Sequence, residues 1–166
     1  KNVSNYSLSK YHFSEWLKLF SKDFYCTNIK IEHFFGAQDD DTKFVISIIK
    51  SFLNNSKRIS LTKGTQKRDF IYIDDVVSAM KKILLYSLKK KRGYDIFEVG
   101  SGINVSIKKI VKLIKKLCDN NSTKLEFGKI PMRKNESLNV KLNLKKLSKL
   151  NWKPKYSLEE SLKKTI

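Results

Sequence analysis

The chain has 166 residues, of which 40% are hydrophobic and 11% aromatic, a composition typical of a globular domain that buries a core. We expect neither a membrane span, since no run approaches about 18 apolar residues, nor a signal peptide. The formal charge of +19 raises the possibility of a nucleic-acid partner. The basic residues are mostly lysines on polar helix faces, which favours a solvated surface. A basic, non-catalytic nucleic-acid-binding module stays open as the alternative.

The cysteines and histidines suggest no special framework. Cys26 and Cys118 are far apart and belong to no C-x-x-C pair, which indicates a reducing, cytoplasmic setting without disulfides. The histidines do not pair with them at metal-ligand spacing, so we expect no metal site.

The first part of the chain alternates helical and strand patterns. Residues 5–20 carry apolar side chains at helical spacing, and residues 28–36 alternate as a strand that ends at a glycine. Residues 42–53 return to helical spacing. Two short β runs follow at 58–62 and 69–73. The first residues already read as the start of a helix and not as a natural beginning, so we expect a piece of a longer protein.

The second part continues the alternation, with a helix over 76–86 and a strand over 95–100. Ser106 is the expected N-cap of a helix that ends near Cys118, and Ser157 with Glu160 fits a capping box. A short strand, an irregular stretch and a short helix lie between them, at 124–129, 131–140 and 144–150. Alternating strands and helices predict an α/β architecture with a largely parallel sheet.

Tyr6 and Lys10 form a candidate proton-transfer pair. Their spacing of four places both side chains on one helix face. A nearby ammonium favours the phenolate form and so lowers the pKa of a tyrosine. Such a tyrosine can give a proton to a forming alkoxide or take one from a sugar hydroxyl. The spacing is common by chance, so a surface tyrosine beside a solvated lysine is the alternative.

Arginines supply the candidate anion contacts. Arg68 opens a strand and can clamp a diphosphate with two donors, and Arg133 lies in an irregular segment that is free to reach a second phosphate or a ribose. The strand over 28–36 should end where ligands bind in open α/β sheets. His33 falls near that end, although a core histidine is the alternative.

Other polar residues have simpler interpretations. Asp74 and Asp75 suit helix caps, and residues 39–41 suit a solvated loop that caps the next helix. Residues 100–102 suit a turn after a strand better than a phosphate cradle. Trp152 and Tyr156 are expected to pack under the last helix.

Taken together, the motifs resemble the NAD-dependent epimerase/dehydratase family of extended short-chain dehydrogenases/reductases. The resemblance covers nearly the whole chain and is strongest for the CDP-abequose/CDP-paratose synthase branch, because of residues 31–40 and 61–64. The matching motifs are Tyr6-Ser-Leu-Ser-Lys10, Glu32-His-Phe-Phe-Gly36, Gln66-Lys-Arg-Asp-Phe-Ile-Tyr-Ile-Asp-Asp75, Pro131-Met-Arg133 and Trp152-Lys-Pro-Lys-Tyr-Ser-Leu-Glu-Glu160.

The resemblance implies a role for each candidate residue. Tyr6 would be the catalytic acid/base, and Lys10 would lower its pKa and bind the nicotinamide ribose. His33 stands where many relatives have asparagine, near the sugar, the diphosphate and the cofactor. Arg68 and Arg133 would contact the nucleotide diphosphate. Two positions depart from the family pattern: His33 stands in place of asparagine, and Lys30 stands in place of an arginine. These departures leave the identity of the substrate open, but they do not affect the resemblance to the family.

The expected fold is α/β: the C-terminal part of a Rossmann-type parallel sheet plus a small mixed α/β substrate domain. Residues 1–36 and 69–101 would belong to the dinucleotide-binding domain, and residues 37–68 and 102–166 to the substrate domain. The implied enzyme uses NAD or NADP and moves a hydride at C4 of a CDP- or dTDP-linked hexose, in surface-polysaccharide synthesis. It would act as a homodimer, without nucleic acid or membrane.

Three reactions stay open: 4-keto reduction, epimerisation and 4,6-dehydration. The residues that separate them should precede Tyr6 in the complete enzyme, together with the dinucleotide fingerprint. We therefore expect this chain alone to be inactive. A degenerate relative used as a binding scaffold is a further alternative.

Overall fold

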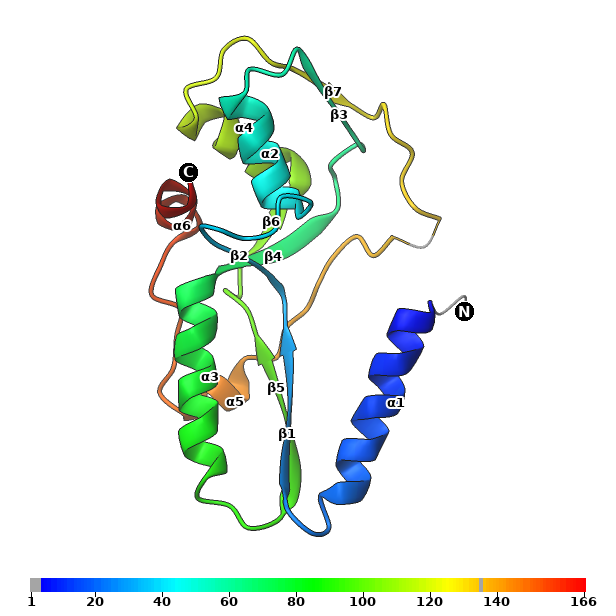
Figure 1. Ribbon diagram of the computed structural model, residues 1–166, viewed down its shortest axis with the longest axis vertical. Helices are drawn as coiled ribbons and strands as arrows, with labels where there is room; N and C mark the ends of the chain where they lie inside the picture. The colour runs from blue at the N-terminus through cyan, green and yellow to red at the C-terminus, as the bar shows by residue number, and fades with distance from the viewer. Residues whose placement is uncertain (1–3, 135) are drawn as a thin grey trace.

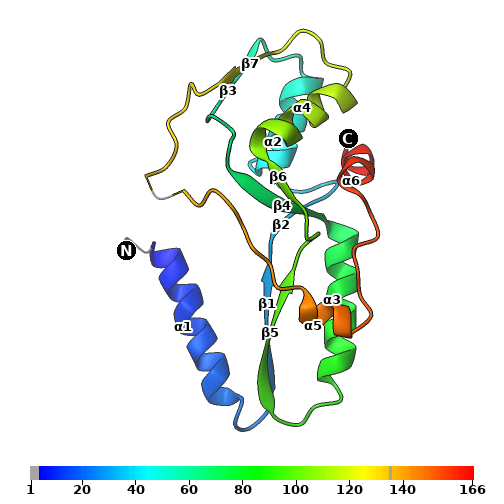
Figure 2. The same cartoon turned by 180° about the vertical axis from the view of Figure 1, so that it is seen from behind.

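The protein is described here from a computed structural model, which covers residues 4–134 and 136–166. Helices and strands alternate along most of the chain, and the molecule is elongated, with two halves joined at its middle (Figures 1 and 2). The elements are α1 (Asn5–Phe20), β1 (Tyr25–Ile31), β2 (His33–Phe35), α2 (Phe44–Leu53), β3 (Arg58–Leu61), β4 (Lys67–Tyr72), α3 (Ile73–Ser87), β5 (Gly93–Val99), β6 (Asn104–Ser106), α4 (Ile107–Leu117), β7 (Lys124–Phe127), α5 (Lys145–Lys149) and α6 (Leu158–Thr165).

The lower half is built on a parallel pair of strands, β1 and β5. Their register runs from Tyr25 opposite Gly93 to Ile31 opposite Val99. In the ribbon, α3 covers one side of this pair and α1 stands on the other (Figure 1). The α/β class predicted from the sequence, with its largely parallel strands, is therefore confirmed.

The strand expected over 28–36 is two strands that separate at Glu32. The Glu32 N–H donates to the Val99 carbonyl oxygen at 3.0 Å, and the Phe34 N–H donates back to the Glu32 carbonyl oxygen at 2.7 Å. This tight turn lets β1 stay beside β5 while β2 leaves to pair with β4. The chain thus passes from one half of the molecule to the other at Glu32.

The upper half holds the remaining strands and the helices α2, α4 and α6 (Figure 2). Strand β4 pairs with β2 in parallel and with β6 in antiparallel fashion, and β3 pairs with β7 in parallel. Strand β6 was not predicted, because three residues are too few to show an alternating pattern. Ser106 and Ser157 cap α4 and α6 as predicted, and Ser157 closes a capping box with Glu160.

Two apolar cores stabilise the two halves. The upper core lies among α2, α4, α6 and β4, and includes Phe52 and Ile110. The lower core lies between α3 and β5 and includes Trp152, whose indole N–H donates to Ser78 Oγ at 2.8 Å. Trp152 therefore packs on α3 and not under α6 as expected, while Tyr156 does pack against the upper core.

The division into two domains stays a prediction. One stretch expected in the substrate domain packs in the lower core, because α5 contributes Leu147 there. We propose that residues 144–152 accompany the sheet domain, and that β2 and β4, whose Phe35, Phe70 and Tyr72 pack in the upper core, accompany the substrate domain.

Asp95 ties α5 to the sheet. Its carboxylate is paired with the Lys146 amine and accepts from the Tyr25 hydroxyl. Burial disfavours the charged carboxylate, but the hydrogen bonds from Lys146 and Tyr25 outweigh it, so the pKa of Asp95 lies below its usual value. Burial and the neighbouring carboxylate raise the pKa of the Tyr25 phenol. These contacts lie at the end of the strand pair that is opposite to β2.

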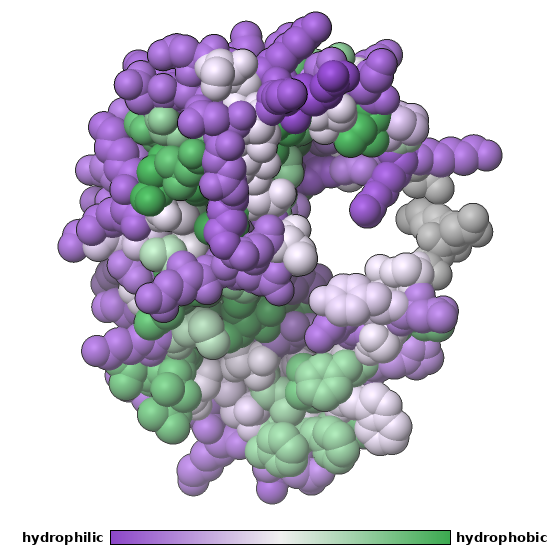
Figure 3. Space-filling view, turned by 45° about the horizontal axis from the view of Figure 1, so that its top comes forward, coloured by the Kyte–Doolittle hydropathy of each residue, from purple (hydrophilic) through white to green (hydrophobic). Residues whose placement is uncertain are grey.

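Helix α1 differs from the rest of the fold, because it contains no buried residue. Ser14 and Leu17, on the side that faces β1, are only partly covered. The space-filling view shows the molecule hollowed between its two halves (Figure 3). Large apolar side chains of α1 are exposed, namely Tyr6, Leu8, Tyr11, Phe13, Trp16, Leu19 and Phe20. Among the described residues, no helix is both long enough and apolar enough to cross a membrane.

Candidate active site

Tyr6 and Lys10 lie on the first turns of α1 and share one face. The helix begins after Ser4, whose hydroxyl oxygen accepts from the Ser7 N–H at 3.2 Å. The Lys10 amine lies 5.5 Å from the centre of the Tyr6 ring. The Tyr6 side chain is 72% exposed, so its hydroxyl is open to a ligand. The structure therefore brings these two predicted residues together.

The pair lines a groove of about 710 Å³ between α1 and the strand pair. Its far wall is β1 together with two side chains of β5, Tyr94 and Ile96. Polar groups on that wall include Lys30 and Asn28, whose amide donates to the Tyr94 hydroxyl at 3.0 Å. The groove is thus an elongated space with a phenol and an amine at one wall and polar side chains at the other.

His33 lies apart from this groove, at the start of β2. Half of its side chain is exposed, with Nδ1 3.5 Å from Glu32 Oε2. Its ring lies 5.7 Å from that of Phe70, its partner across the β2–β4 ladder. A second hollow of about 240 Å³ opens here, with Phe34 and Phe44 in its walls. The alternative of a core histidine is therefore wrong.

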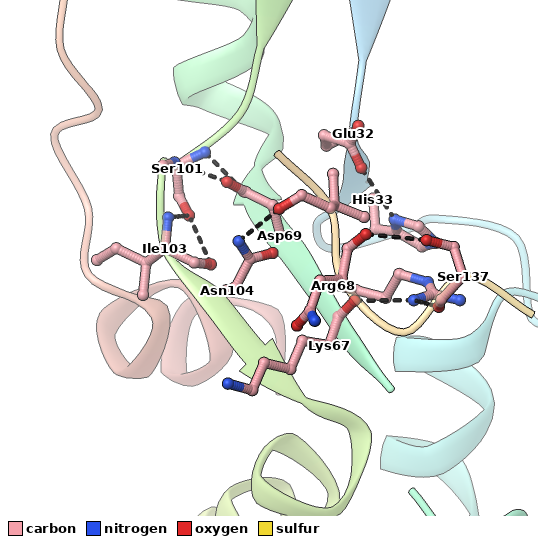
Figure 4. A network of polar contacts seen from close by, with 12 residues as sticks. Glu32, His33, Lys67, Arg68, Asp69, Ser101, Ile103, Asn104 and Ser137 are labelled. Carbon is pink, nitrogen blue, oxygen red and sulfur yellow. Dashed lines mark hydrogen bonds and ion pairs between the residues drawn. The ribbon is translucent and has the colours of Figure 1, made fainter. Parts of the chain in front are cut away.

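Arg68 lies on β4 and is enclosed by the segment that precedes α5. We call residues 136–143 the strap (Figure 4). Arg68 Nη1 donates to the carbonyl oxygens of Lys67 at 2.8 Å and Ser137 at 2.7 Å, and Nη2 forms an ion pair with Glu136. Only 12% of the Arg68 side chain is exposed. Contacts within the protein therefore hold this arginine.

Arg133 is exposed and joined to the strap by one hydrogen bond. The Glu136 N–H donates to the Arg133 carbonyl oxygen at 3.1 Å, which places Arg133 next to the strap residue that pairs with Arg68. The structure thus brings together Tyr6 with Lys10, and Arg68 with the strap, but Arg68 does not line the groove that contains Tyr6 and Lys10. His33 is near Arg68 in register, since its partner Phe70 is two residues along β4.

Asp69 fixes the turn after β5. Its two carboxylate oxygens accept from the backbone N–H groups of Ser101 and Gly102, both at 2.7 Å, and the side chain is 1% exposed (Figure 4). A Cβ at Gly100 would lie 2.3 Å from Leu142 Cδ1 and 3.1 Å from the Asp69 carboxylate, so a side chain there would require these neighbours to shift. These N–H groups are used inside the protein, which supports a turn and not a phosphate cradle.

The other acidic residues are structural, but not as predicted. Asp75 accepts from the backbone N–H groups of Lys155 at 2.8 Å and Tyr156 at 3.2 Å, so it binds a distant segment and does not cap α3. Asp39 pairs with Lys43 and Asp40 accepts from Thr42, while α2 has no side-chain cap. Within residues 4–134 and 136–166, no three acidic, histidine or cysteine side chains gather as a metal site requires.

Comparison with known proteins places this site in a family. Residues 1–100 match the model of the NAD dependent epimerase/dehydratase family. The chain belongs to this family. The matched region contains Tyr6, Lys10, His33 and Arg68 and thus most of the predicted site. The family resemblance inferred from the motifs is confirmed.

Members of the family that are similar to this chain include two synthases and one solved epimerase. CDP-abequose synthase of Salmonella muenchen is 37% identical over 99% of this chain and 56% of its own length, and that of Salmonella typhimurium is 32% identical over 100% and 56%. The UDP-glucose 4-epimerase of Thermotoga maritima, solved with UDP-glucose, superimposes with a TM-score of 0.82 at 26% identity, over 98% of this chain and 52% of its own. The chain spans about half the length of the curated relatives it matches.

Sequence reasoning missed the contacts of two acidic residues near the candidate site, Glu136 and Asp69. Glu136 is the partner of Arg68, and the only sequence signal was an acidic residue three positions after Arg133. Asp69 holds the turn after β5, and its sequence signal was a single carboxylate in a strand that is otherwise apolar after Arg68. Both contacts join segments that are far apart in the chain, which no local pattern reveals.

Proposed function

We propose that this protein is an NAD(P)-dependent nucleotide-sugar enzyme that transfers a hydride at C4 of a CDP- or dTDP-linked hexose. The similarity to CDP-abequose synthases favours reduction of a 4-keto sugar on CDP, in the synthesis of a surface polysaccharide. The observation that carries this proposal is the pair of Tyr6 and Lys10 facing an open groove.

The groove fits one end of a dinucleotide. Its α1 wall offers a hydroxyl and an amine, which suit the ribose hydroxyls next to a nicotinamide, and its length follows β1. Lys10 would hold the ribose, and Tyr6 would stay within reach of the reacting carbon. When bound, the nicotinamide supplies the hydride. The strands of Rossmann sheets end where such ligands bind, which agrees with the position of Tyr6 near the β2 end of the groove.

The chemistry assigned to this chain is acid–base catalysis and binding. Tyr6 offers a hydroxyl that can give or take a proton, with the Lys10 amine 5.5 Å from the centre of its ring. Tyr6 would give its proton to the C4 oxygen as the alcohol forms, or take that proton in the reverse direction. Arg68 and Arg133 would bind the diphosphate, with His33 beside the sugar and the cofactor.

The test is turnover by the full-length protein that contains this chain. A CDP-linked 4-keto-6-deoxyhexose is mixed with NADPH, and loss of absorbance at the nicotinamide band is followed together with the sugar product. Consumption of one NADPH per sugar alcohol supports reduction. Interconversion of C4 epimers without net NADPH loss would replace reduction by epimerisation, and inertness towards CDP, dTDP and UDP sugars alike would overturn the proposal.

We also expect a homodimer of the intact protein. The exposed aromatic side chains of α1, among them Phe13, Trp16 and Phe20, form an apolar surface that a partner helix can cover. Sedimentation of the full-length protein tests this, and a monomer at micromolar concentration would contradict it.

A further inference from the structure

The strap is attached to the fold at several points along its length. At its first residues, Glu136 and Ser137 bind Arg68, and the Leu138 carbonyl oxygen accepts from the Lys67 N–H at 2.8 Å. Farther on, the Asn143 N–H donates to Glu98 Oε2 at 2.6 Å. The strap is therefore held at β4 by Arg68 and by one backbone hydrogen bond, which together we call its first anchor. It is held at β6 by the Asn104 amide, which donates to the Val140 carbonyl oxygen at 2.7 Å, and at β5 by Glu98.

The guanidinium of Arg68 is only partly used by these contacts. An arginine has five N–H donors, and in the described residues three are engaged, by the carbonyl oxygens of Lys67 and Ser137 and by Glu136. The two carbonyl groups hold Nη1 and fix the direction of the side chain. The carboxylate of Glu136 is different, because it neutralises the charge that would attract a diphosphate.

We propose that Glu136 is a positioning residue that sets the affinity of Arg68 for the diphosphate. This inference rests on the proposed function, in which Arg68 contacts that group. In the free protein Glu136 occupies the guanidinium. A diphosphate offers the same arginine two negative phosphates, displaces the single carboxylate and so removes one of the contacts that hold the strap on β4. Nucleotide binding and the attachment of the strap are then coupled, since both use one guanidinium.

The coupling free energy is only as large as the difference between the binding of Arg68 to Glu136 and its binding to a diphosphate. The Arg68–Glu136 pair is mostly shielded from solvent, with exposed fractions of 12% and 22%, so salt screens it less than a surface pair. Removing the charge of Glu136 leaves the two carbonyl contacts in place, and Arg68 keeps its direction. We therefore expect the affinity for a diphosphate to rise, not fall, when Glu136 loses its charge.

The experiment uses inorganic pyrophosphate as the probe, with the full-length protein. Calorimetry gives its dissociation constant, and hydrogen exchange follows the Lys67 amide, which reports the first anchor. Glu136→Gln should bind pyrophosphate roughly 5- to 50-fold more tightly, the range of ordinary coupling between sites. Its Lys67 amide should exchange as slowly as in the unmodified protein, because the contacts through the Ser137 and Leu138 carbonyl oxygens remain and the strap stays attached to β4.

Two controls separate the possible outcomes. Glu98→Ala removes the carboxylate that accepts from the Asn143 N–H and leaves the contacts of Arg68 in place, so it should leave the dissociation constant unchanged. Arg68→Gln should weaken binding. An unchanged or weaker affinity in Glu136→Gln, while Arg68→Gln still weakens binding, would overturn the role of Glu136 and leave the proposed diphosphate contact standing. Equal binding in Arg68→Gln and the unmodified protein would overturn both.

Discussion

The two faces of the β1–β5 pair differ in how closely their helices pack. On one side α3 buries Ala79 and Ile83 against the sheet and, with Trp152, closes the lower core. On the other side α1 has no buried residue and borders a groove that contains Tyr6 and Lys10. One layer thus stabilises the fold, while the other leaves its side chains free for chemistry.

This difference suits the role that we propose for α1. Residues that contribute to folding must lose contact with water, whereas a phenol that exchanges protons with a ligand must keep access to it. The chain separates the two demands by assigning them to opposite faces of the same strands. Substitutions on α1 should therefore change activity, and substitutions in the cores should change stability.

The largest expected effect is on the rate. Tyr6→Phe in the full-length protein should lower kcat by roughly two to four orders of magnitude, the usual scale for loss of a general acid. Because Tyr6 is exposed, the free energy of unfolding should not change measurably. Steady-state kinetics and urea denaturation measure the two quantities. A kcat within a few-fold of normal would remove Tyr6 from the proposed mechanism.

The next effect is on stability in the upper core. Phe52 is 1% exposed, and Phe52→Ala should cost about 3–5 kcal/mol of unfolding free energy through lost burial and a cavity. The control is Trp16→Ala on α1, where the side chain is 57% exposed and the loss in the 166-residue chain should stay within about 0.5 kcal/mol. Chemical denaturation compares them, and equal losses would contradict the separation of roles.

A smaller effect is expected at Asp75. Asp75→Asn replaces one acceptor oxygen by a donor opposite the backbone N–H groups of Lys155 and Tyr156. An unsatisfied buried group costs about 1–3 kcal/mol, and the segment that leads to α6 should exchange its amides faster. Asp74→Asn is the matched control, because Asp74 is its exposed neighbour at the start of the same helix. Comparable losses in both variants would mean that Asp75 acts only on the helix dipole.

The smallest effect is on the pH dependence of stability. The pKa of Asp95 is lower in the folded protein than its ordinary value of about 3.9, so its contribution is present above that value and is lost as pH falls through the folded pKa. Asp95→Asn should therefore lower the free energy of unfolding at pH 7. In strong acid the free energies of unfolding of the variant and of the unmodified protein should become more similar. Urea denaturation at several pH values measures this. Asp23→Asn, at an exposed site, should show no such convergence.

The sequence predicted the elements better than their contacts. Helices with a strong apolar period, such as 42–53 and 76–86, were found within a few residues, because burial of one face sets both the pattern and the helix. The break at Glu32 was not predicted, since alternation continues across it and only the change of partner from β5 to β4 reveals it. Strand β6 was missed for its shortness.

For the site, the sequence predicted a pair that is local and missed a pair that is not. Tyr6 and Lys10 are one helical turn apart, so spacing alone puts them side by side. Arg68 and Glu136 are 68 positions apart, and their contact depends on how the strap crosses β4. Their charges are visible in the sequence, but the partner of each is fixed only by the fold.

Gly100 lies close to Asp69, so a residue without a functional side chain adjoins the candidate site. A methyl group at position 100 would push against Leu142 of the strap and against the carboxylate of Asp69. Asp69 is the residue that follows Arg68 in β4. A genetic selection for lost nucleotide use should accordingly recover Gly100→Ala, although that residue would touch neither sugar nor phosphate. Under the proposed function, Gly100 would thus influence nucleotide binding through Leu142 and Asp69 without touching the nucleotide itself.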